Sequence, residues 1–182
     1  MAFSIRPATV DDLFAAQALN LTCLPENYQL KYYFYKRLSW PQLQFVAEDA
    51  HKNPVGYTLG KIETEEEGDK SSVGHITSLG VLRTHRQAGL AKMLMNVAHN
   101  TMVDTFDVKK SSLHVRVTNL SAFSLYCNVL GYQVDKCEVG YYENNEDAFS
   151  MRKVLQAPVS RPTATTTTRV KKGKKDKGKK RR

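Results

Sequence analysis

The residues best suited to bind a phosphate form the segment RQAGLA at 86–91, which follows the β-rich run GHITSLGVL at 74–82. Apolar side chains recur at helical spacing after Leu90, so the segment joins a strand to the start of a helix. The first N–H groups of a helix have no internal acceptor, and the helix dipole makes them partly positive. Gly89 lets the backbone approach a ligand, and Arg86 adds a cation. The segment therefore predicts a phosphate or pyrophosphate site, although many strand–glycine–helix junctions bind nothing.

Several other kinds of site are excluded by spacing. No Gly-Lys-Ser/Thr follows the segment, so it is not a Walker loop, and the G-x-G-x-x-G spacing of dinucleotide-binding folds is missing. No set of His, Cys, Asp and Glu has the spacing of metal ligands, so we expect no metal. The three cysteines, Cys23, Cys127 and Cys137, are an odd number without a pattern, which favours reduced, buried thiols in an intracellular protein.

Periodicity and turn signals predict the elements that must position these residues. We expect strands at 3–6, 45–48, 55–62, 73–82, 112–117, 132–137 and 148–154, and helices at about 9–19, 32–38, 89–105 and 119–130. Thr9 to Asp12 resembles a capping box with Asp in the Glu position, Asn119 is a suitable N-cap, and Gly131 ends the last helix. The helix at 89–105 is expected to bury Leu90, Leu94, Val97, Ala98 and Met102. The order β-α-α-β-β-β-α-β-α-β-β indicates an α/β fold with a mixed, mostly antiparallel central sheet flanked by about four helices.

Charge divides the chain into a folded domain at 1–157 and a tail at 158–182. Residues 169–182 contain ten Lys/Arg and one Asp, whereas residues 1–168 contain 17 basic and 17 acidic residues. The Thr-rich and then Lys/Arg-rich tail lacks the apolar residues needed to fold, so we expect it to be disordered. We find no signal peptide and no apolar run of the ~18 residues that span a bilayer, so we expect a soluble, cytoplasmic protein without a membrane partner.

Beyond these patterns, the chain resembles a known family. The RxxGxA pattern at 86–91 is similar to the acetyl-CoA pyrophosphate loop of the GNAT acetyltransferase superfamily, and the predicted order of elements coincides with the GNAT fold. Five further segments closely resemble the catalytic subunits of eukaryotic NatA complexes: LPENY at 24–28, YYFY at 32–35, LSWP at 38–41, GHITSL at 74–79 and YY at 141–142. The resemblance covers about residues 3–155. Two departures are Gln87-Ala88 in place of the common Arg-Leu, which removes one possible phosphate contact, and Gly80 in place of Ala.

The resemblance implies transfer of an acetyl group from acetyl-CoA to the α-amine of protein chains, co-translationally, on small first residues (Ser, Ala, Thr, Gly) exposed after Met removal. It implies that Glu26 positions or deprotonates the amine, and that Arg116 orients Glu26 or the peptide. His75 would act as a base or hold a water. Tyr142, with Tyr141, would flank the peptide entrance, and it could also hydrogen-bond the substrate or protonate the leaving thiolate.

The remaining site residues implied by the resemblance concern binding. Tyr126 would reach the thioester sulfur as a general acid, and Leu24, Pro25, Glu26 and Tyr28 would wall the pocket for the first substrate residue. Acetyl-CoA would be held by Leu79, Val81, Arg86, Gln87, Ala88, Gly89, Leu90, Ala91, Asn119 and Tyr126.

Structural roles remain open for the same side chains. Glu26 would then be a solvated loop carboxylate, Arg116 part of an ion pair, and His75 a hydrogen-bonded core residue. Tyr126, Tyr141 and Tyr142 would be packing aromatics.

The resemblance also implies partners: a large helical-repeat auxiliary subunit of NatA type, contacted by residues 10–38, and through it the ribosome and nascent chains. Other acceptors remain possible, namely acidic N-termini, lysine or polyamines when the chain is free of a partner. A function of another class, ribosome or nucleic-acid binding, would act through residues 169–182, because a dense cationic segment binds phosphate backbones. The same tail is also compatible with a nuclear localisation signal or with no function.

Overall fold

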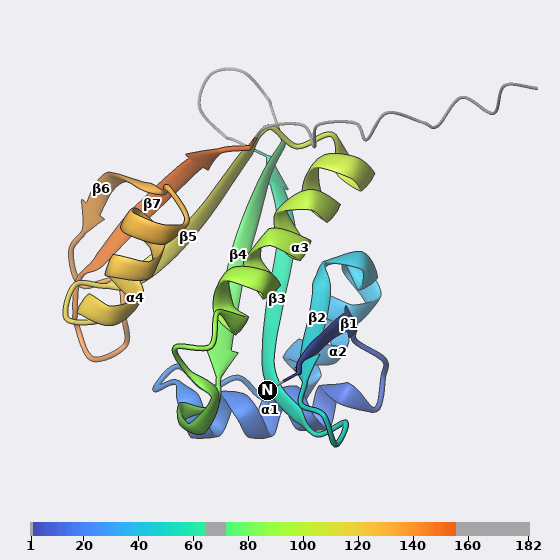
Figure 1. Cartoon of the computed structure of the whole chain (residues 1–182). Helices are drawn as coiled ribbons and strands as arrows, with labels where there is room; N and C mark the ends of the chain where they lie inside the picture. The colour runs from blue at the N-terminus through green and yellow to red at the C-terminus, as the bar shows by residue number, and fades with distance from the viewer. Residues whose placement is uncertain (1, 65–71, 156–182) are drawn as a thin grey trace, which may run out of the picture.

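A twisted seven-stranded sheet with helices on both faces organises the molecule (Figure 1). The computed structural model describes residues 2–64 and 72–155, so the predicted tail at 158–182 lies outside the described residues. The strands are β1 (Ser4–Pro7), β2 (Gln44–Glu48), β3 (Pro54–Thr64), β4 (Ser72–Val81), β5 (Lys110–Arg116), β6 (Gln133–Glu138) and β7 (Ala148–Val154). The helices are α1 (Asp12–Cys23), α2 (Leu30–Ser39), α3 (Leu90–Phe106) and α4 (Leu120–Ser124), with short 3-10 turns at Pro41–Leu43 and Arg83–His85. The predicted α/β class and the mixed sheet are confirmed.

The junction between β4 and β5 is the feature of the sheet that matters for function. The strand order is β1-β2-β3-β4-β5-β7-β6, and β4 with β5 is the one parallel pair in this sheet. Their pairing is confined to 74–76 with 111–113. Opposite β3, Ser78 pairs with Leu59 and Ile76 with Gly60, which leaves Thr77 as an extra residue in a bulge. Beyond the bulge the two strands diverge and open a wedge in the sheet (Figure 1).

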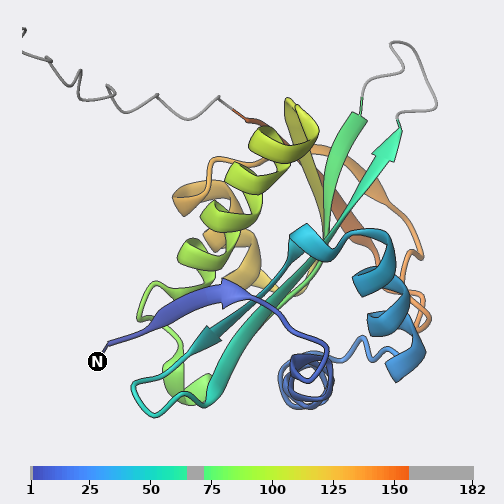
Figure 2. The same ribbon diagram turned by 90° about the vertical axis from the view of Figure 1, so that its right-hand side faces the viewer.

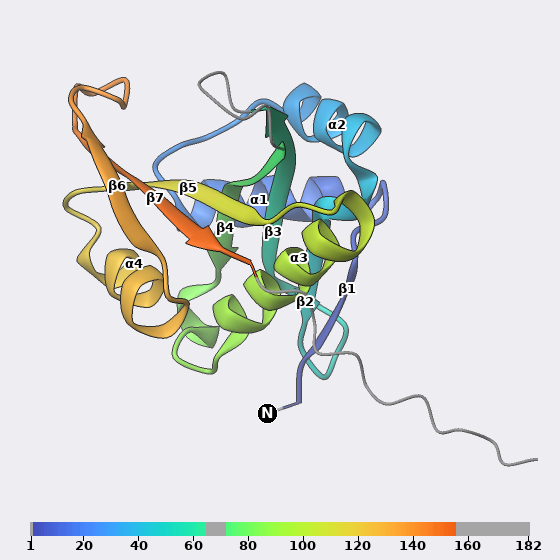
Figure 3. The same ribbon diagram turned by 90° about the horizontal axis from the view of Figure 1, so that it is seen from above.

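The helices divide between the two faces of the sheet, as Figures 2 and 3 show: α1 and α2 cover one face, and α3 and α4 the other. The α3 face is filled by a cluster that includes Leu90, Leu94, Met95, Ala98 and Met102, all at most 1% exposed. The opposite face is filled by Leu13, Ala16, Leu19 and Tyr33 packed on Val46, Tyr57 and Leu59. Within residues 2–64 and 72–155, no helix has both the length and the apolar character needed to cross a membrane.

Three local predictions needed correction. The Thr9 hydroxyl donates to the Asp12 carboxylate (2.8 Å) instead of accepting from the helix, so only one half of the expected capping box forms and α1 begins at Asp12. Val97 is only partly buried, and Cys137 is exposed because β6 is an edge strand. Cys23 and Cys127 are half-buried, and all three thiols are free.

The last predicted helix is also different in form. Asn119 caps it as expected, accepting from the Ala122 N–H (3.2 Å), but regular α-helix ends at Ser124 and a π-helical turn follows at Leu125–Val129. The Tyr132 N–H reaches back to the Tyr126 carbonyl (2.9 Å), and Gly131 supplies the positive φ of 74° that this tight ending requires.

Asp12 gives the fold a defined sensitivity to acid. Its side chain is 8% exposed and accepts two hydrogen bonds from Arg6, which lower its pKa from 3.8 to about 2. A pKa lowered in the folded state stabilises the fold above pH 4, and this contribution is lost as the pH falls through that range toward 2. Asp12→Asn should therefore reduce the free energy of unfolding by about 2 kcal/mol at pH 7 and leave it unchanged near pH 2. Urea denaturation at both pH values measures this, and an equal loss at both would contradict it.

Gly80 is explained by its neighbour on β3. A Cβ at this position would lie 2.6 Å from Cε1 of Tyr57, whose ring is fully buried and whose hydroxyl is bonded to Ser78 (2.6 Å) and Asn20 (3.0 Å). The ring has no free direction in which to move. Gly80→Ala should therefore cost about 1–3 kcal/mol of stability by overpacking. Thermal or urea denaturation tests this, and the loss should shrink in a Tyr57→Leu background, where the clashing ring atoms are gone.

Candidate active site

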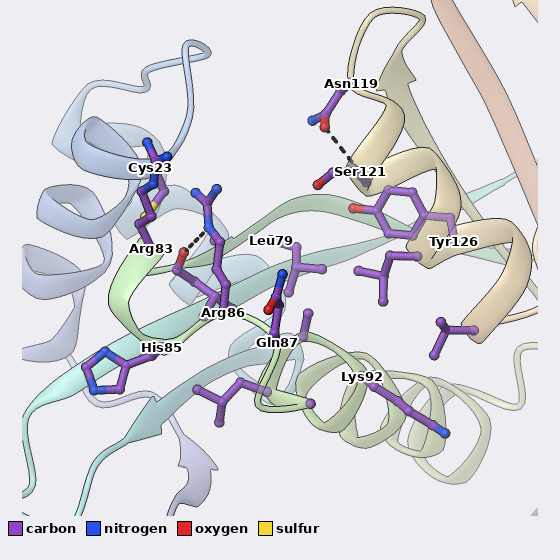
Figure 4. A pocket seen from close by; sticks show the side chains of 18 of the residues that line it. Cys23, Leu79, Arg83, His85, Arg86, Gln87, Lys92, Asn119, Ser121 and Tyr126 are labelled. Carbon is purple, nitrogen blue, oxygen red and sulfur yellow. Dashed lines mark hydrogen bonds between the residues drawn. The ribbon is translucent and has the colours of Figure 1, made fainter.

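A cavity of about 1000 Å³ lies where β4 and β5 diverge. One wall is β4 from Leu79 to Val81, and the opposite wall is α4 with its π-turn (Figure 4). Because β5 pairs with β4 only as far as Ile76, the β5-facing edge of β4 is open beside the cavity. An open strand edge offers N–H and C=O groups to a ligand that carries amides of its own.

The predicted phosphate loop closes one end of this cavity. Gly89 is the N-cap of α3 and adopts a left-handed conformation (φ 81°), with no heavy atom within 4 Å of where a Cβ would be. Glycine adopts this φ without strain, and it leaves the first N–H groups of α3 open to a ligand. The Arg86 Nε donates to the Val81 carbonyl (3.1 Å), which holds the arginine beside the loop and occupies one backbone group assigned to the cofactor. Gln87 is also left-handed (φ 63°).

The opposite wall carries two of the predicted side chains. Asn119 lies at the start of α4, and Tyr126 lies in the π-turn (Figure 4). Tyr126 is 9% exposed, and burial raises its pKa to about 12, so its phenol remains protonated at neutral pH. A protonated phenol at this position can donate a hydrogen bond to a group in the cavity.

The structure brings nearly all predicted cofactor residues to one cavity. Leu79, Val81, Arg86, Gln87, Gly89, Leu90, Ala91, Asn119 and Tyr126 line it, and Ala88 is the one predicted cofactor residue that does not. Leu24, assigned to the acceptor pocket, also lines it. Further lining residues not predicted are Cys23, Gly80, Arg83, His85, Lys92, Ser121, Ala122, Leu125 and Val129. Arg83, His85 and Lys92 add basic groups around the loop, a clustering that the sequence already displays.

A second cluster lies around Arg116 at the end of β5. The Arg116 Nε donates to the Glu26 carboxylate, and its Nη1 donates to Glu146 and to the side-chain oxygen of Asn144 (2.9 Å). The Tyr142 ring lies over the guanidinium, with its centroid 4.0 Å from Cζ. The predicted residues Glu26, Arg116 and Tyr142 are thus gathered around one guanidinium, although they come from three different segments.

The buried side-chain amide of Asn20 holds the loop that carries Glu26. The Asn20 Nδ2 donates to the Glu26 carbonyl (2.9 Å) and to the Tyr57 hydroxyl (3.0 Å), and Asn20 is fully buried. The Tyr57 hydroxyl in turn contacts Ser78 on β4 (2.6 Å). The Glu26 backbone is therefore tied to the strand that forms the cavity wall.

The predicted residues Tyr142, Tyr141 and His75 lie in a row of rings that is completed by His114. The Tyr142 ring meets Tyr141 (5.1 Å between centroids), Tyr141 stacks on His114 (4.4 Å, 11°), and His114 lies 5.5 Å from His75. Tyr28 stacks on Tyr32 at 4.5 Å. Tyr141 is 47% exposed, consistent with a position at an entrance. Pro25 is exposed in the same loop as Glu26, with its carbonyl accepting from Asn27 (3.1 Å).

His75 lies at the inner end of the row, away from Glu26. Its Nδ1 contacts the Ser112 hydroxyl (2.9 Å), and burial is the main cause that lowers its pKa to about 4. A neutral imidazole of such low basicity takes a proton from an amine poorly but can hold a water. Burial also raises the pKa of Tyr142, with the nearby Glu26 adding to the effect, so Tyr142 stays protonated.

The cavity and the Arg116 cluster adjoin at two points of the chain. Cys23 and Leu24 line the cavity while Glu26 belongs to the cluster, and Arg116 belongs to the cluster while Asn119 lines the cavity. A ligand held in the wedge and a second ligand held beside Glu26 would thus meet across the open edge of β4. In the part of the chain that the structure describes, no group of three or more His, Cys, Asp or Glu is arranged to hold a metal ion.

Three residues were not singled out from the sequence: Glu146 and Asn144 of the Arg116 cluster, and His114 of the aromatic row. His114 had a detectable signal, since Ser112, His114 and Arg116 alternate with buried Leu113 and Val115 and must share one face of β5. Glu146 had none, because it lies in the loop between β6 and β7 without periodicity.

Comparison with known proteins agrees with this geometry. Residues 13–132 match the acetyltransferase (GNAT) family model. The N-terminal acetyltransferase A complex catalytic subunit NAA10 of Arabidopsis thaliana is 55% identical over 152 residues, covering 84% of this chain and 78% of the relative. The N-alpha-acetyltransferase daf-31 of Caenorhabditis elegans is 51% identical over 152 residues, covering 84% and 82%. A chain in the crystal structure of the NatC complex bound to Gag peptide and CoA matches with a TM-score of 0.77 at 28% identity, covering 86% of this chain and all of that chain.

Proposed function

Because the chain belongs to the acetyltransferase (GNAT) family and is an N-alpha-acetyltransferase that uses acetyl-CoA, we propose that it acetylates protein chains beginning with a small residue exposed after Met removal. The observation that carries this proposal is the contact of Glu26 with Arg116 beside the cavity, which places a carboxylate where an amine can approach the wedge. Leu24, Pro25 and Tyr28 lie in the same loop as Glu26 and would border the first side chain of the substrate.

Acetyl-CoA supplies the activated acyl group when bound, and the chain's own residues fit it. The N-terminus of α3 and Arg86 would hold the pyrophosphate, and the open edge of β4, through the backbone of Leu79 and the N–H of Val81, would pair with the amide-bearing arm, since Arg86 occupies the Val81 carbonyl. Tyr126 donates a hydrogen bond toward the departing sulfur. Because a thiol has a pKa of ~8.5 and Tyr126 about 12, the phenol stabilises the thiolate without losing its proton.

The acceptor α-amine has a pKa of ~7.7–8.0, so most of it is protonated at pH 7. Glu26 takes a proton from the amine, directly or through a water, including the proton that the neutral nitrogen must lose as it attacks the acyl carbon, and Arg116 orients Glu26 for that step. Tyr141 and Tyr142 flank the peptide. His75 holds a water at the inner end of the row, a role that its neutral ring allows.

We also propose a partner and a location. The Arabidopsis relative is named as the catalytic subunit of a complex, and the α1–α2 side of this chain exposes large apolar side chains: Phe14 (57%), Leu21 (60%), Tyr35 (56%) and Leu38 (84%). Such a patch suits a protein partner, here a large helical-repeat auxiliary subunit that brings the enzyme to nascent chains at the ribosome in the cytoplasm. Contacts of residues 169–182 with RNA belong to the same proposal, and those residues lie outside the described ones.

Turnover of acetyl-CoA on two peptides tests the proposal. One peptide begins with Ser and the other with Asp-Asp, each assayed with and without the auxiliary subunit. Small-residue specificity predicts that the Ser peptide is preferred in the complex. A matched control carries a blocked N-terminus and an internal lysine. Turnover on that control alone would reassign the acceptor to lysine, and preference for Asp-Asp in the complex would refute the small-residue specificity.

A further inference from the structure

In the Arg116 cluster, the guanidinium of Arg116 is shared between two carboxylates that come from different loops. Its Nε donates to the Oε1 of Glu26 in the loop between α1 and α2, and its Nη1 donates to the Oε2 of Glu146 in the loop between β6 and β7. The Thr118 hydroxyl holds the other oxygen of Glu146. The hydrogen bonds from Thr118 and then Arg116 lower the pKa of Glu146, so it is ionised at neutral pH. Two anions and one cation leave the cluster with a formal charge of −1.

Glu26 is incompletely paired with this guanidinium. An arginine facing a single carboxylate tends to form two parallel hydrogen bonds to both oxygens, which would occupy Glu26 fully. Here the Nη1 is held by Glu146 and by the Asn144 side-chain oxygen (2.9 Å). Arg116 bonds Glu26 through Nε and one oxygen, and the second oxygen of Glu26 is not taken up by Arg116.

We propose that Glu146 is a positioning residue for the acceptor amine. It anchors the guanidinium through Nη1, so that the Nε is held toward Glu26, and it adds the negative charge that lets the cluster capture the substrate's α-ammonium group. This inference rests on the proposed function, because the ligand it explains is a protonated N-terminus. It assigns to Glu146 no proton transfer of its own.

The charge state of the substrate makes the inference testable. An amine of pKa ~7.7–8.0 is mostly ammonium at pH 7 and mostly neutral at pH 9. The groups that face Arg116 and Glu146 are Glu26, Tyr28, Tyr141 and Tyr142. Burial raises the pKa of each of the three tyrosines above the usual 10, so they stay neutral over this range. The substrate amine is thus the group whose charge changes between the two pH values.

Glu146→Gln is the variant to assay, with a Ser-starting peptide and acetyl-CoA at pH 7 and pH 9. The KM for the peptide should rise about tenfold at pH 7, the size of one lost charge-assisted contact, and less than about twofold at pH 9. The KM for acetyl-CoA should stay unchanged, because Glu146 does not line the cavity. Glu143→Gln is the matched control: it removes the same charge from an exposed position in the same loop and should change neither KM.

The outcomes separate the alternatives. An equal rise in the peptide KM of Glu146→Gln at both pH values would show a purely structural role and overturn the inference. A peptide KM of Glu146→Gln equal to that of Glu143→Gln at pH 7 would also overturn it. A wild-type enzyme inactive on the Ser peptide would refute the proposed function instead. Should Glu146→Gln fail to fold, Thr118→Val keeps the charge and removes the hydroxyl that holds Glu146. It should raise the peptide KM about threefold at pH 7 alone, and no change there would also overturn the inference.

Discussion

Glu26→Gln is expected to lower kcat/KM for a Ser-starting peptide by about 100-fold at pH 7, the lower end of what a positioned acid–base group contributes. The amide keeps the shape and the hydrogen bond from the Arg116 Nε, and it cannot accept a proton from the amine. The loop should stay in place, since Asn20 holds the Glu26 backbone and not its side chain. Initial rates over a range of peptide concentrations, with melting temperatures alongside, measure the effect.

The pH dependence of this variant distinguishes it from changes elsewhere in the cluster. Glu26 accepts the proton that the amine loses as it attacks, so we expect much of the loss in kcat of Glu26→Gln to persist at pH 9. The peptide KM of Glu146→Gln, in contrast, should return close to the wild-type value at pH 9. Glu143→Gln again serves as a control that should be fully active. If the Glu26→Gln enzyme kept the wild-type kcat, Glu26 would have only a binding role. The proton would then be taken by a water held elsewhere in the aromatic row.

Gly89→Val is expected to weaken acetyl-CoA binding by at least about 30-fold, because two independent effects add. The φ of 81° is strained for any residue with a Cβ and most of all for a β-branched one. The new side chain would also project from the N-cap of α3 into the space where the pyrophosphate approaches the first N–H groups. Calorimetry or fluorescence with acetyl-CoA measures the binding.

Gly131→Val separates binding from stability. Gly131 has a similar φ of 74°, a Cβ added there would likewise meet no heavy atom within 4 Å, and the residue lies outside the cavity. Both variants should lose a similar free energy of unfolding, of about 1–2 kcal/mol. Only Gly89→Val should lose affinity for acetyl-CoA. Equal affinity of both variants would show that the backbone of the loop is not the pyrophosphate site.

The sequence by itself determined the class of the fold and the position of the glycine-containing loop that begins α3. These follow from local patterns: an apolar repeat of two or 3.6 residues, a glycine at a helix start and an Asn at a cap, all settled within a few residues of chain. The resemblance added which residues would bind the cofactor and which would bind the acceptor. The structure gathers most of them in the cavity and in the adjoining Arg116 cluster. Ala88 is the exception in the loop, since it does not line the cavity.

Only the tertiary structure decided how the charged side chains are arranged in the Arg116 cluster. Arg116 and Glu26 are 90 positions apart and Arg116 and Glu146 are 30 apart, so no local pattern links them. They meet because the sheet order places the end of β5 beside β7, with the loop after α1 alongside the open wedge. The divergence of β4 and β5 likewise depends on a one-residue bulge at Thr77, which is a property of pairing with β3. Local propensities select the elements, whereas contacts between distant segments, which depend on register and strand order, create the cavity and the shared guanidinium.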